Sequence, residues 1–378
     1  MPELPGKQVY LTRASSFLCS EVERARKLIE TACKGYKIKK VSTVEDKLVY
    51  TGGITHHEFA KELEGRTITG CERKGKNFWI TLTGSGRLPM AHFGMTGMIQ
   101  FKGQEPTWYR RRPKESTDVW PPKFHKFVMH LEPQKGSVSD EARELAFADP
   151  RRFGRLRLVP SPVEDHPPIS ALGFDPILSY PSLEEFKTLL LKKKATVKGV
   201  IMDQSFSAGV GNWVADEILY QARIHPACPV QELTEDQIGE LHKQIRAVPE
   251  KAVEVNADSM RFPEDWLFRW RWDKGKKQPG GAKVKNEDGE FVGMLEQLKP
   301  KDKDFLALPN GKPATIEFIE VAGRTSAVVT ELQKMPAGVD IKPKVTKGSK
   351  GGKKSRRGKA DSDSVGRCQA RQDCSQKG

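Results

Sequence analysis

The chain contains 378 residues and has a formal net charge of +15 and a sequence pI of about 9.4. This length allows two domains, each with its own core, and a tail. No apolar run approaches the roughly 20 residues of a membrane-spanning helix, and the N-terminus lacks the basic and then apolar pattern of a signal peptide, so neither a membrane nor a secreted protein is expected. The basic composition favours a polyanionic partner, with DNA or RNA as the first candidate.

The six cysteines do not form a metal-binding or disulfide pattern. None belongs to a C-x-x-C pair, and their scattered positions match neither a zinc finger nor a disulfide framework. They indicate reduced thiols in a cytosolic or nuclear protein. The residues concerned are Cys19, Cys33, Cys71, Cys228, Cys368 and Cys374.

The first five residues, MPELP, carry possible covalent chemistry. Removal of the initiator Met would leave Pro2 as the N-terminal residue, with a secondary amine. Such an amine is partly neutral near pH 7 and can attack a carbonyl or a sugar carbon to form an iminium intermediate. Glu3 is placed to shuttle a proton. Taken alone, the same residues are also compatible with a stiff, exposed terminus.

The next segments predict a helix followed by a sheet-rich domain. Residues 21–33 have helical periodicity, and Gly35 follows as a stop signal. The apolar face of this helix comprises Val22, Ala25, Ile29 and Ala32. From residue 38 to about 159, short alternating runs broken by Gly and Pro predict a two-layer β-sandwich. Within them, residues 104–122 resemble an insertion loop with three consecutive, solvated arginines.

A second domain, mostly helical, is predicted after a Pro-rich linker. Toward its end, residues 315–321 and 326–330 predict a β-hairpin with its tip at 322–325. The fold class is therefore α+β. The expected segments are the sandwich domain at 1–160, the linker at 161–181, the helical domain at 182–335 and a tail at 336–378.

The tail is rich in Gly, Lys and Ser and is predicted to be disordered. About a dozen basic residues in it outnumber about four acidic ones. We interpret it as a segment that tethers the protein to DNA or directs it to the nucleus. An inert solubilising tail is the alternative.

A glycine-rich turn that leads into a helix lies within residues 204–226. Gly209 and Gly211 permit a tight turn, and Asn212 is expected to be the N-cap of the following helix. Asp216 and Glu217 would then suit the positive end of the helix dipole. Such a turn is typical of a phosphate-binding site.

Five segments in the same order resemble the formamidopyrimidine-DNA glycosylase family. They are MPELP at 1–5, RKGK at 73–76, HFGMTG at 92–97, DPRRFG at 149–154 and the helix–two-turn–helix segment at 204–226. The resemblance extends from residue 1 to about 330 and does not cover the tail. The family usually has a four-cysteine zinc finger, whereas the C-terminal hairpin here has no cysteine and resembles the zincless finger of plant and fungal members. No metal and no cofactor are therefore expected.

The resemblance implies a base excision repair enzyme that is both a DNA glycosylase and an AP lyase. Its substrates would be oxidised purines, such as 8-oxoguanine and formamidopyrimidines, in damaged double-stranded DNA, and it would act as a nuclear monomer without membrane attachment. The implied catalytic residues are Pro2 as nucleophile, Glu3 as proton shuttle, and Lys76 and Arg324 as phosphate ligands. The implied DNA-binding residues are His92 and Asn212, which contact phosphates, and Met95, Arg151 and Phe153, which fill the space left by the flipped nucleotide.

Three alternatives remain open. The first is an endonuclease VIII-like specificity for oxidised pyrimidines, because the pocket loops cannot be interpreted from the sequence. The second is a catalytically inactive protein that binds damaged DNA. The third is an RNA-binding helix–two-turn–helix protein of ribosomal type, which would need neither Pro2 nor the set Met95, Arg151 and Phe153.

One departure from the family affects the N-terminus. Family members begin PELPEVE, whereas residues 6–20 here interrupt that pattern. Deleting them restores MPELPEVERARKLIE. We hypothesise that residues 6–20 are a retained intron in the gene model. The alternative is a true loop that lets Glu21 return to the site.

Overall fold

The computed structural model describes residues 19–104, 119–135, 137, 139–272, 284–285, 291–292 and 305–339. Pro2 and Glu3, nearly all of the proposed insert, most of the Arg-rich loop and the tail beyond residue 339 lie outside these residues. Residues 1–346 belong to one compact unit and residues 347–378 to a second. Within the described ranges, no helix is long and apolar enough to cross a membrane.

The predicted first helix is confirmed as α1, Cys19–Cys33. All four residues of its predicted apolar face are buried. Gly35 follows with φ of 85°, a left-handed conformation that glycine adopts without strain, and the chain then turns into the first strand. The helical periodicity therefore identified both the element and its buried side.

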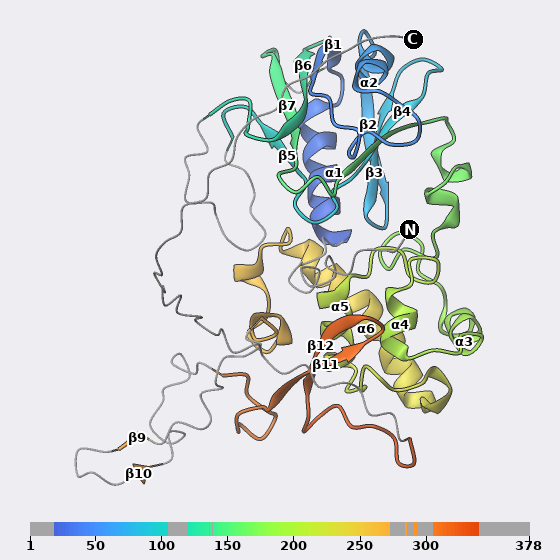
Figure 1. Ribbon diagram of the computed structural model, residues 1–378, viewed down its shortest axis with the longest axis vertical. Helices are drawn as coiled ribbons and strands as arrows, with labels where there is room; N and C mark the ends of the chain where they lie inside the picture. The colour runs from blue at the N-terminus through green and yellow to red at the C-terminus, as the bar shows by residue number, and fades with distance from the viewer. Residues whose placement is uncertain are drawn as a thin grey trace, which may run out of the picture. The chain divides into compact units, whose positions relative to one another are not determined.

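Two antiparallel four-stranded sheets form the expected β-sandwich (Figure 1). The first has the order β1-β6-β7-β5, with β1 Lys37–Thr43, β5 Met98–Phe101, β6 His125–Glu132 and β7 Arg143–Ala148. The second has the order β2-β3-β4-β8, with β2 Ile68–Lys74, β3 Asn77–Leu82, β4 Leu88–His92 and β8 Arg155–Val159. A further helix, α2 His56–Leu63, begins with a capping box at Thr55. Phe59, Phe78, Phe127 and Phe147 belong to the buried core of this part of the chain.

The second part of the chain is helical, as predicted. Its helices are α3 Leu183–Leu191, α4 Val197–Met202, α5 Asn212–Gln221 and α6 Glu235–Glu254. Short 3-10 turns lie in the linker, between the helices or after α6, at Val163–Asp165, Ile169–Ala171, Val230–Glu232, Ser259–Arg261 and Leu267–Arg269. Farther along the chain, β9 Val284–Lys285 pairs with β10 Phe291–Val292. Trp213 of α5 is fully buried and packs against the rings of Phe262 and Phe268.

The C-terminal hairpin consists of β11 Ile316–Val321 and β12 Arg324–Val329. It is tighter than predicted, because Val321 pairs directly with Arg324 and only Ala322 and Gly323 form the turn. Both turn residues have positive φ, 49° and 67°, as the two-residue turns of twisted hairpins require. Arg324 is therefore the first residue of a strand, at the base of the turn.

Candidate nucleic-acid interface

The turn at residues 149–154 is held in place by the buried side chain of Asp149. Its Oδ1 accepts a hydrogen bond from the Arg151 backbone N at 3.2 Å, and its Oδ2 accepts one from the Gly154 N at 2.6 Å. The Thr96 hydroxyl donates to Oδ1 at 2.5 Å. Asp149 thus connects this turn with the one at residues 93–97.

A second anchor is Arg152, whose backbone has a φ of 58°. Its guanidinium donates to both carboxylate oxygens of Asp46 at 2.9 Å, and Lys126 Nζ lies 2.8 Å from Asp46 Oδ2. Burial opposes ionisation of Asp46, but the hydrogen bonds from Arg152 and Lys126 outweigh it and lower its pKa to about 2. Arg152 therefore fixes the turn, and its neighbours are left to face solvent.

Those neighbours are Arg151 and Phe153, both exposed. The Arg151 guanidinium lies 4.9 Å from the centroid of the Phe153 ring, and Phe153 is 38% exposed. A phenylalanine at the surface, stacked with a cation and held on a braced turn, is suited to contact a base or to enter a base stack. It is not part of the hydrophobic core.

Met95 belongs to the turn at residues 93–97, which packs against the backbone of Phe153. Gly94, with φ of 62°, packs so closely that an added Cβ would lie 2.4 Å from the carbonyl carbon and oxygen of Phe153. Met95 itself is half-buried. The structure therefore brings together Met95, Arg151 and Phe153, which are 58 residues apart in the sequence at their extremes.

His92 ends β4 and is largely enclosed. Its Nδ1 accepts a hydrogen bond from the Gly94 backbone N at 2.9 Å. Burial, together with the nearby cations Lys76, Arg155 and Arg157, lowers the pKa of His92 to about 4. His92 is thus a neutral imidazole near pH 7 with its proton on Nε2, which can donate to a phosphate.

We expect the free energy of unfolding to fall as the pH drops from about 6.5 to about 4, because the unfolded chain takes up a proton at His92 and the folded chain does not. Above pH 6.5 the residue is neutral in both states and contributes no pH dependence. Urea melts of the unsubstituted chain and of His92→Gln, from pH 4 to pH 8, measure this term. His57→Gln, at an exposed position of α2, is the control. Equal pH dependence with and without His92 would contradict the expectation.

Lys76 and Asn212 lie where the sandwich meets the glycine-rich turn. Lys76 Nζ donates to the Val210 carbonyl at 3.1 Å. Asn212 is the first residue of α5, and its N-cap is Gly211, so the predicted N-cap role was wrong. The Asn212 amide instead reaches across to the hairpin, where Nδ2 donates to the Thr325 carbonyl at 3.0 Å. Helix-capping rules consider only neighbours in the sequence, so they could not predict that the Asn212 side chain bonds to Thr325.

Arg324 is adjacent to Thr325 and is exposed. Within residues 305–339, the hydrogen bond seen for its side chain runs from Nη1 to the carbonyl of the preceding Gly323, at 3.2 Å. The contacts of Lys76 with Val210 and of Asn212 with Thr325 therefore connect three predicted phosphate ligands from the sandwich, the helical part and the hairpin. These side chains are all donors, which suits an anionic backbone.

The sequence did not identify the buried cluster below the hairpin. Asp216 was expected at the helix dipole but is 1% exposed, and it accepts hydrogen bonds from Lys198 Nζ at 2.5 Å and Arg271 Nη2 at 2.8 Å. Lys198 Nζ also lies 2.6 Å from Ser326 Oγ of β12. Glu217 is likewise buried, and its carboxylate accepts from the Phe268 backbone N at 2.9 Å. A buried charge has no local sequence signal, because its partners are far away in the chain.

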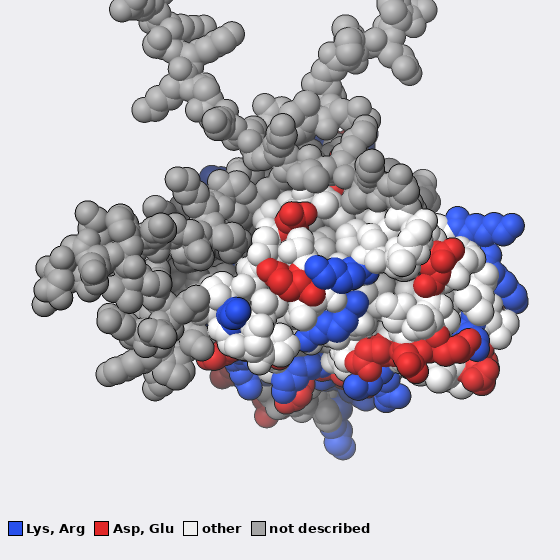
Figure 2. Space-filling view, turned by 90° about the horizontal axis from the view of Figure 1, so that it is seen from below, with Lys and Arg blue, Asp and Glu red and all other residues white. Residues whose placement is uncertain are grey.

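The lower face in Figure 2 bears both signs of charge. Lysine and arginine side chains lie among aspartate and glutamate there, wherever the surface is not covered by grey atoms. Over all described residues, no group of three or more His, Cys, Asp or Glu side chains could hold a metal ion. Pro2 and Glu3 lie outside the described residues.

Comparison with known proteins agrees with this arrangement. The N-terminal domain of formamidopyrimidine-DNA glycosylase, as a family model, matches residues 19–156, and the H2TH domain of the same enzyme matches residues 172–264. A formamidopyrimidine-DNA glycosylase of Arabidopsis thaliana is 40% identical over 335 residues, which cover 89% of this chain and 71% of the relative. This chain belongs to the formamidopyrimidine-DNA glycosylase family. It is thus a DNA glycosylase of that type, from a family that acts in DNA repair.

Bacterial relatives and solved structures extend the match. The formamidopyrimidine-DNA glycosylase of Desulforamulus reducens is 28% identical over 343 residues, covering 88% of this chain and 99% of the relative. The Lactococcus lactis enzyme bound non-covalently to DNA containing an AP site has a TM-score of 0.59 at 22% identity, covering 84% of this chain and 99% of that one. MutM in complex with DNA containing carbocyclic 8-oxo-G has a TM-score of 0.58 at 23% identity, covering 83% and 98%. These structures establish the shared fold.

Proposed function

We propose that the protein is a bifunctional DNA glycosylase and AP lyase that excises oxidised purines, such as 8-oxoguanine and formamidopyrimidines, from duplex DNA. The observation that carries the proposal is the convergence of Met95, Arg151 and Phe153 on two braced turns. A half-buried thioether together with an exposed guanidinium and an exposed ring can fill a gap in a base stack. Flipping a nucleotide costs a few kcal/mol of unstacking, which such wedges help to recover.

The chemistry would be supplied by the N-terminus. The neutral amine of Pro2 attacks C1′ of the damaged nucleotide, and the base leaves as the C1′–N bond to Pro2 forms. Glu3 shuttles protons during this exchange. The C1′–O4′ bond of the sugar then breaks, O4′ takes up a proton, and C1′ becomes the carbon of an iminium. The iminium drives β,δ-elimination of both flanking phosphates. Lys76, Asn212 and Arg324 would hold phosphates near the lesion during these steps, assisted by His92 as a neutral donor.

The interrupted N-terminus is part of the proposal. The family match begins at residue 19 and α1 begins at Cys19, which supports the hypothesis that residues 6–20 are foreign to the family pattern. If they are a retained intron, the correctly spliced enzyme places Pro2 fifteen residues closer in the sequence to Glu21 than the chain as written does. Sequencing the transcript tests this directly, because a message that retains the 45 bases for these residues would refute it.

The decisive experiment is borohydride trapping on a duplex that contains 8-oxoguanine. The chain as written and the same chain without residues 6–20 are compared, each with a Pro2→Gly control that abolishes the secondary amine. We expect a covalent adduct from the shortened form at least, because only a Schiff base is reduced to a stable adduct. Adducts from neither form on purine lesions would contradict the proposed specificity.

A second specificity has some support. One similar structure is the Lactococcus lactis enzyme in complex with DNA containing an oxidised pyrimidine, with a TM-score of 0.60 at 22% identity. Trapping on an oxidised-pyrimidine duplex but not on 8-oxoguanine would favour that alternative. Binding to abasic-site DNA without any adduct would instead indicate a catalytically inactive protein that recognises damaged DNA.

We also propose that the protein is a nuclear monomer. Residues 340–378 contain twelve basic and four acidic residues, which suits DNA tethering or nuclear import. Comparing the cellular distribution of the full chain with that of a chain ending at residue 339 tests the localisation. An unchanged distribution would assign the tail another role.

A further inference from the structure

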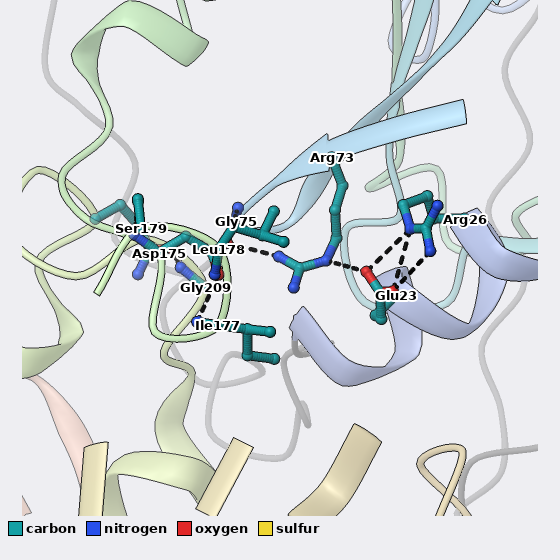
Figure 3. Close-up of polar contacts among 10 residues, drawn as sticks. Glu23, Arg26, Arg73, Gly75, Asp175, Ile177, Leu178, Ser179 and Gly209 are labelled. Atoms are coloured by element: carbon teal, nitrogen blue, oxygen red, sulfur yellow. Dashed lines mark hydrogen bonds and ion pairs between the residues drawn. The ribbon is translucent and has the colours of Figure 1, made fainter. Parts of the chain in front are cut away.

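A buried guanidinium, that of Arg73, lies between carboxylates from two distant parts of the chain (Figure 3). Arg73 Nε donates to Glu23 Oε2 of α1 at 2.6 Å, and its Nη1 donates to Asp175 Oδ2 at 2.6 Å. The side chains of Arg73 and Asp175 are 0% exposed and that of Glu23 is 8% exposed. We call these three residues the Arg73 network. Arg73 is the first residue of the RKGK segment, but the sequence predicted no role for any of the three.

The Asp175 end of the network is joined to the helical part. Its Oδ1 accepts from the backbone N of Ile177 at 2.9 Å and of Leu178 at 3.1 Å. The carbonyl of the preceding residue, Phe174, accepts from the Ala208 backbone N at 2.8 Å. Through its neighbour Phe174, Asp175 is therefore hydrogen-bonded to the glycine-rich turn that precedes Asn212.

The Arg73 end is joined to the turn that carries Lys76. Asp175 Oδ2 also accepts from the Gly75 backbone N at 2.8 Å. A Cβ added to Gly75 would lie 3.1 Å from both the Gly209 backbone N and the Ala208 Cβ, so this turn packs directly on the glycine-rich turn. One carboxylate thus fixes two turns that present predicted phosphate ligands.

The Glu23 end reaches the helix that follows the N-terminal segment. Glu23 is in the second turn of α1, and Arg26 Nη2 holds its Oε1 at 2.9 Å. Burying such charges brings little net stability, because well-packed apolar residues of similar volume are often as stable. A planar guanidinium between two carboxylates instead fixes their geometry. Its donors can satisfy both carboxylates in only one relative arrangement.

We propose that the Arg73 network is a positioning device, which holds α1, the helix that follows the N-terminal segment, in register with Lys76 and the glycine-rich turn. This inference rests on the proposed function, because the register is useful only if the amine must reach C1′ while phosphates are held. Glu23, Arg73 and Asp175 are positioning residues rather than catalytic residues. They control the distance between the nucleophile and the DNA backbone. They do not hold the turns that carry Met95, Arg151 and Phe153.

Asp175→Asn removes one charge from the network with little change in shape. We expect the single-turnover rate of adduct formation on an 8-oxoguanine duplex to fall about 100-fold, the order of effect of a displacement of about 1 Å. The Kd for a duplex with a tetrahydrofuran abasic-site analogue should change less than about threefold, because base-stack contacts are intact and the loss is confined to the chemical step. The form of the chain that traps most efficiently is used throughout.

Two further variants separate positioning from folding. Glu62→Gln is the matched control, since Glu62 of α2 pairs with Arg87 at 3.0 Å in the same sandwich without contacting the Arg73 network. The double variant Arg73→Met with Asp175→Asn should melt at a higher temperature than Asp175→Asn alone and yet remain slow. No buried guanidinium then lacks its partner, and the asparagine oxygen can still accept from the backbone N of Ile177 and Leu178. Recovery of the rate by this double variant, or normal trapping by Asp175→Asn, overturns the inference. Failure of the unsubstituted chain to trap any lesion would instead contradict the proposed function on which the inference depends.

Discussion

Replacement of Asp216 by alanine should lower the free energy of unfolding by about 3–5 kcal/mol, the usual cost of removing one partner from a buried ion pair. The Asp216 carboxylate accepts from Lys198, from Arg271 and from the Ala327 backbone N at 3.2 Å. Without it, two buried cations and one buried N–H lose their shared acceptor. Burial already lowers the pKa of Lys198 to about 8, and Asp216 opposes that shift, so the lysine would become harder to keep charged.

The consequence should extend to the hairpin. Lys198 contacts Ser326, and Asp216 contacts the backbone of β12, so this cluster joins the hairpin to α4 and α5. We expect Asp216→Ala to expose the hairpin to protease and to weaken binding to abasic-site DNA, since Arg324 and the partner of Asn212 are on β12.

Urea melting, limited proteolysis and DNA binding measure these effects. Glu240→Ala, which removes a surface pair with Lys243 on α6, should cost less than about 1 kcal/mol. Addition of EDTA should leave the melting temperature of the unsubstituted chain unchanged. Equal losses for Asp216→Ala and Glu240→Ala, or a melting temperature that depends on the chelator, would show that the cluster does not hold the hairpin.

The second large effect is expected for Gly94→Ala. Gly94 has a φ of 62°, and its added Cβ would lie 2.4 Å from backbone atoms of Phe153. Left-handed strain of about 1 kcal/mol and overpacking of about 1–3 kcal/mol together predict a loss of about 2–4 kcal/mol. The two turns must also separate, so Met95 would no longer lie beside Arg151 and Phe153.

We therefore expect Gly94→Ala to reduce the preference for abasic-site over undamaged duplex by about tenfold, equivalent to about 1.4 kcal/mol. Gly239→Ala is the matched control, because Gly239 lies inside α6 with no atom within 4 Å of an added Cβ. It should be neutral or stabilising, as alanine is favoured within helices. A Gly94→Ala chain that melts and discriminates like Gly239→Ala would show that the close contact of the two turns has no role in recognition.

Much of the architecture followed from local patterns. The apolar periodicity of α1, the alternating runs of the sandwich and the turn residues of the hairpin all predicted the elements found. These patterns are local because the residues on the buried face of a strand or a helix recur at a fixed spacing in the sequence. The roles expected for Met95 and Phe153 came only from the resemblance of their motifs to a family, and they stay a prediction.

Tertiary partners explain where local rules were wrong. Asn212 was expected to cap its helix, and it bonds to Thr325 of the hairpin instead. Asp216 was expected to suit a helix dipole, and it is buried between Lys198 and Arg271. From the sequence alone a charged residue is expected to face solvent. The partners that permit burial of Asp216 lie 18 and 55 residues away in the chain.

The sequence by itself determined the α+β class, the order of the elements and the chemistry that each turn can offer. Only the tertiary structure decided that Met95 meets Phe153, that Asp149 and Asp46 brace their turn, and that Arg73 joins α1 to the glycine-rich turn. The physical reason is that secondary structure depends on contacts within a few residues. A binding surface depends on backbone turns packed together from distant segments, and that packing is set by buried charges and close glycine contacts, which have no periodic signal.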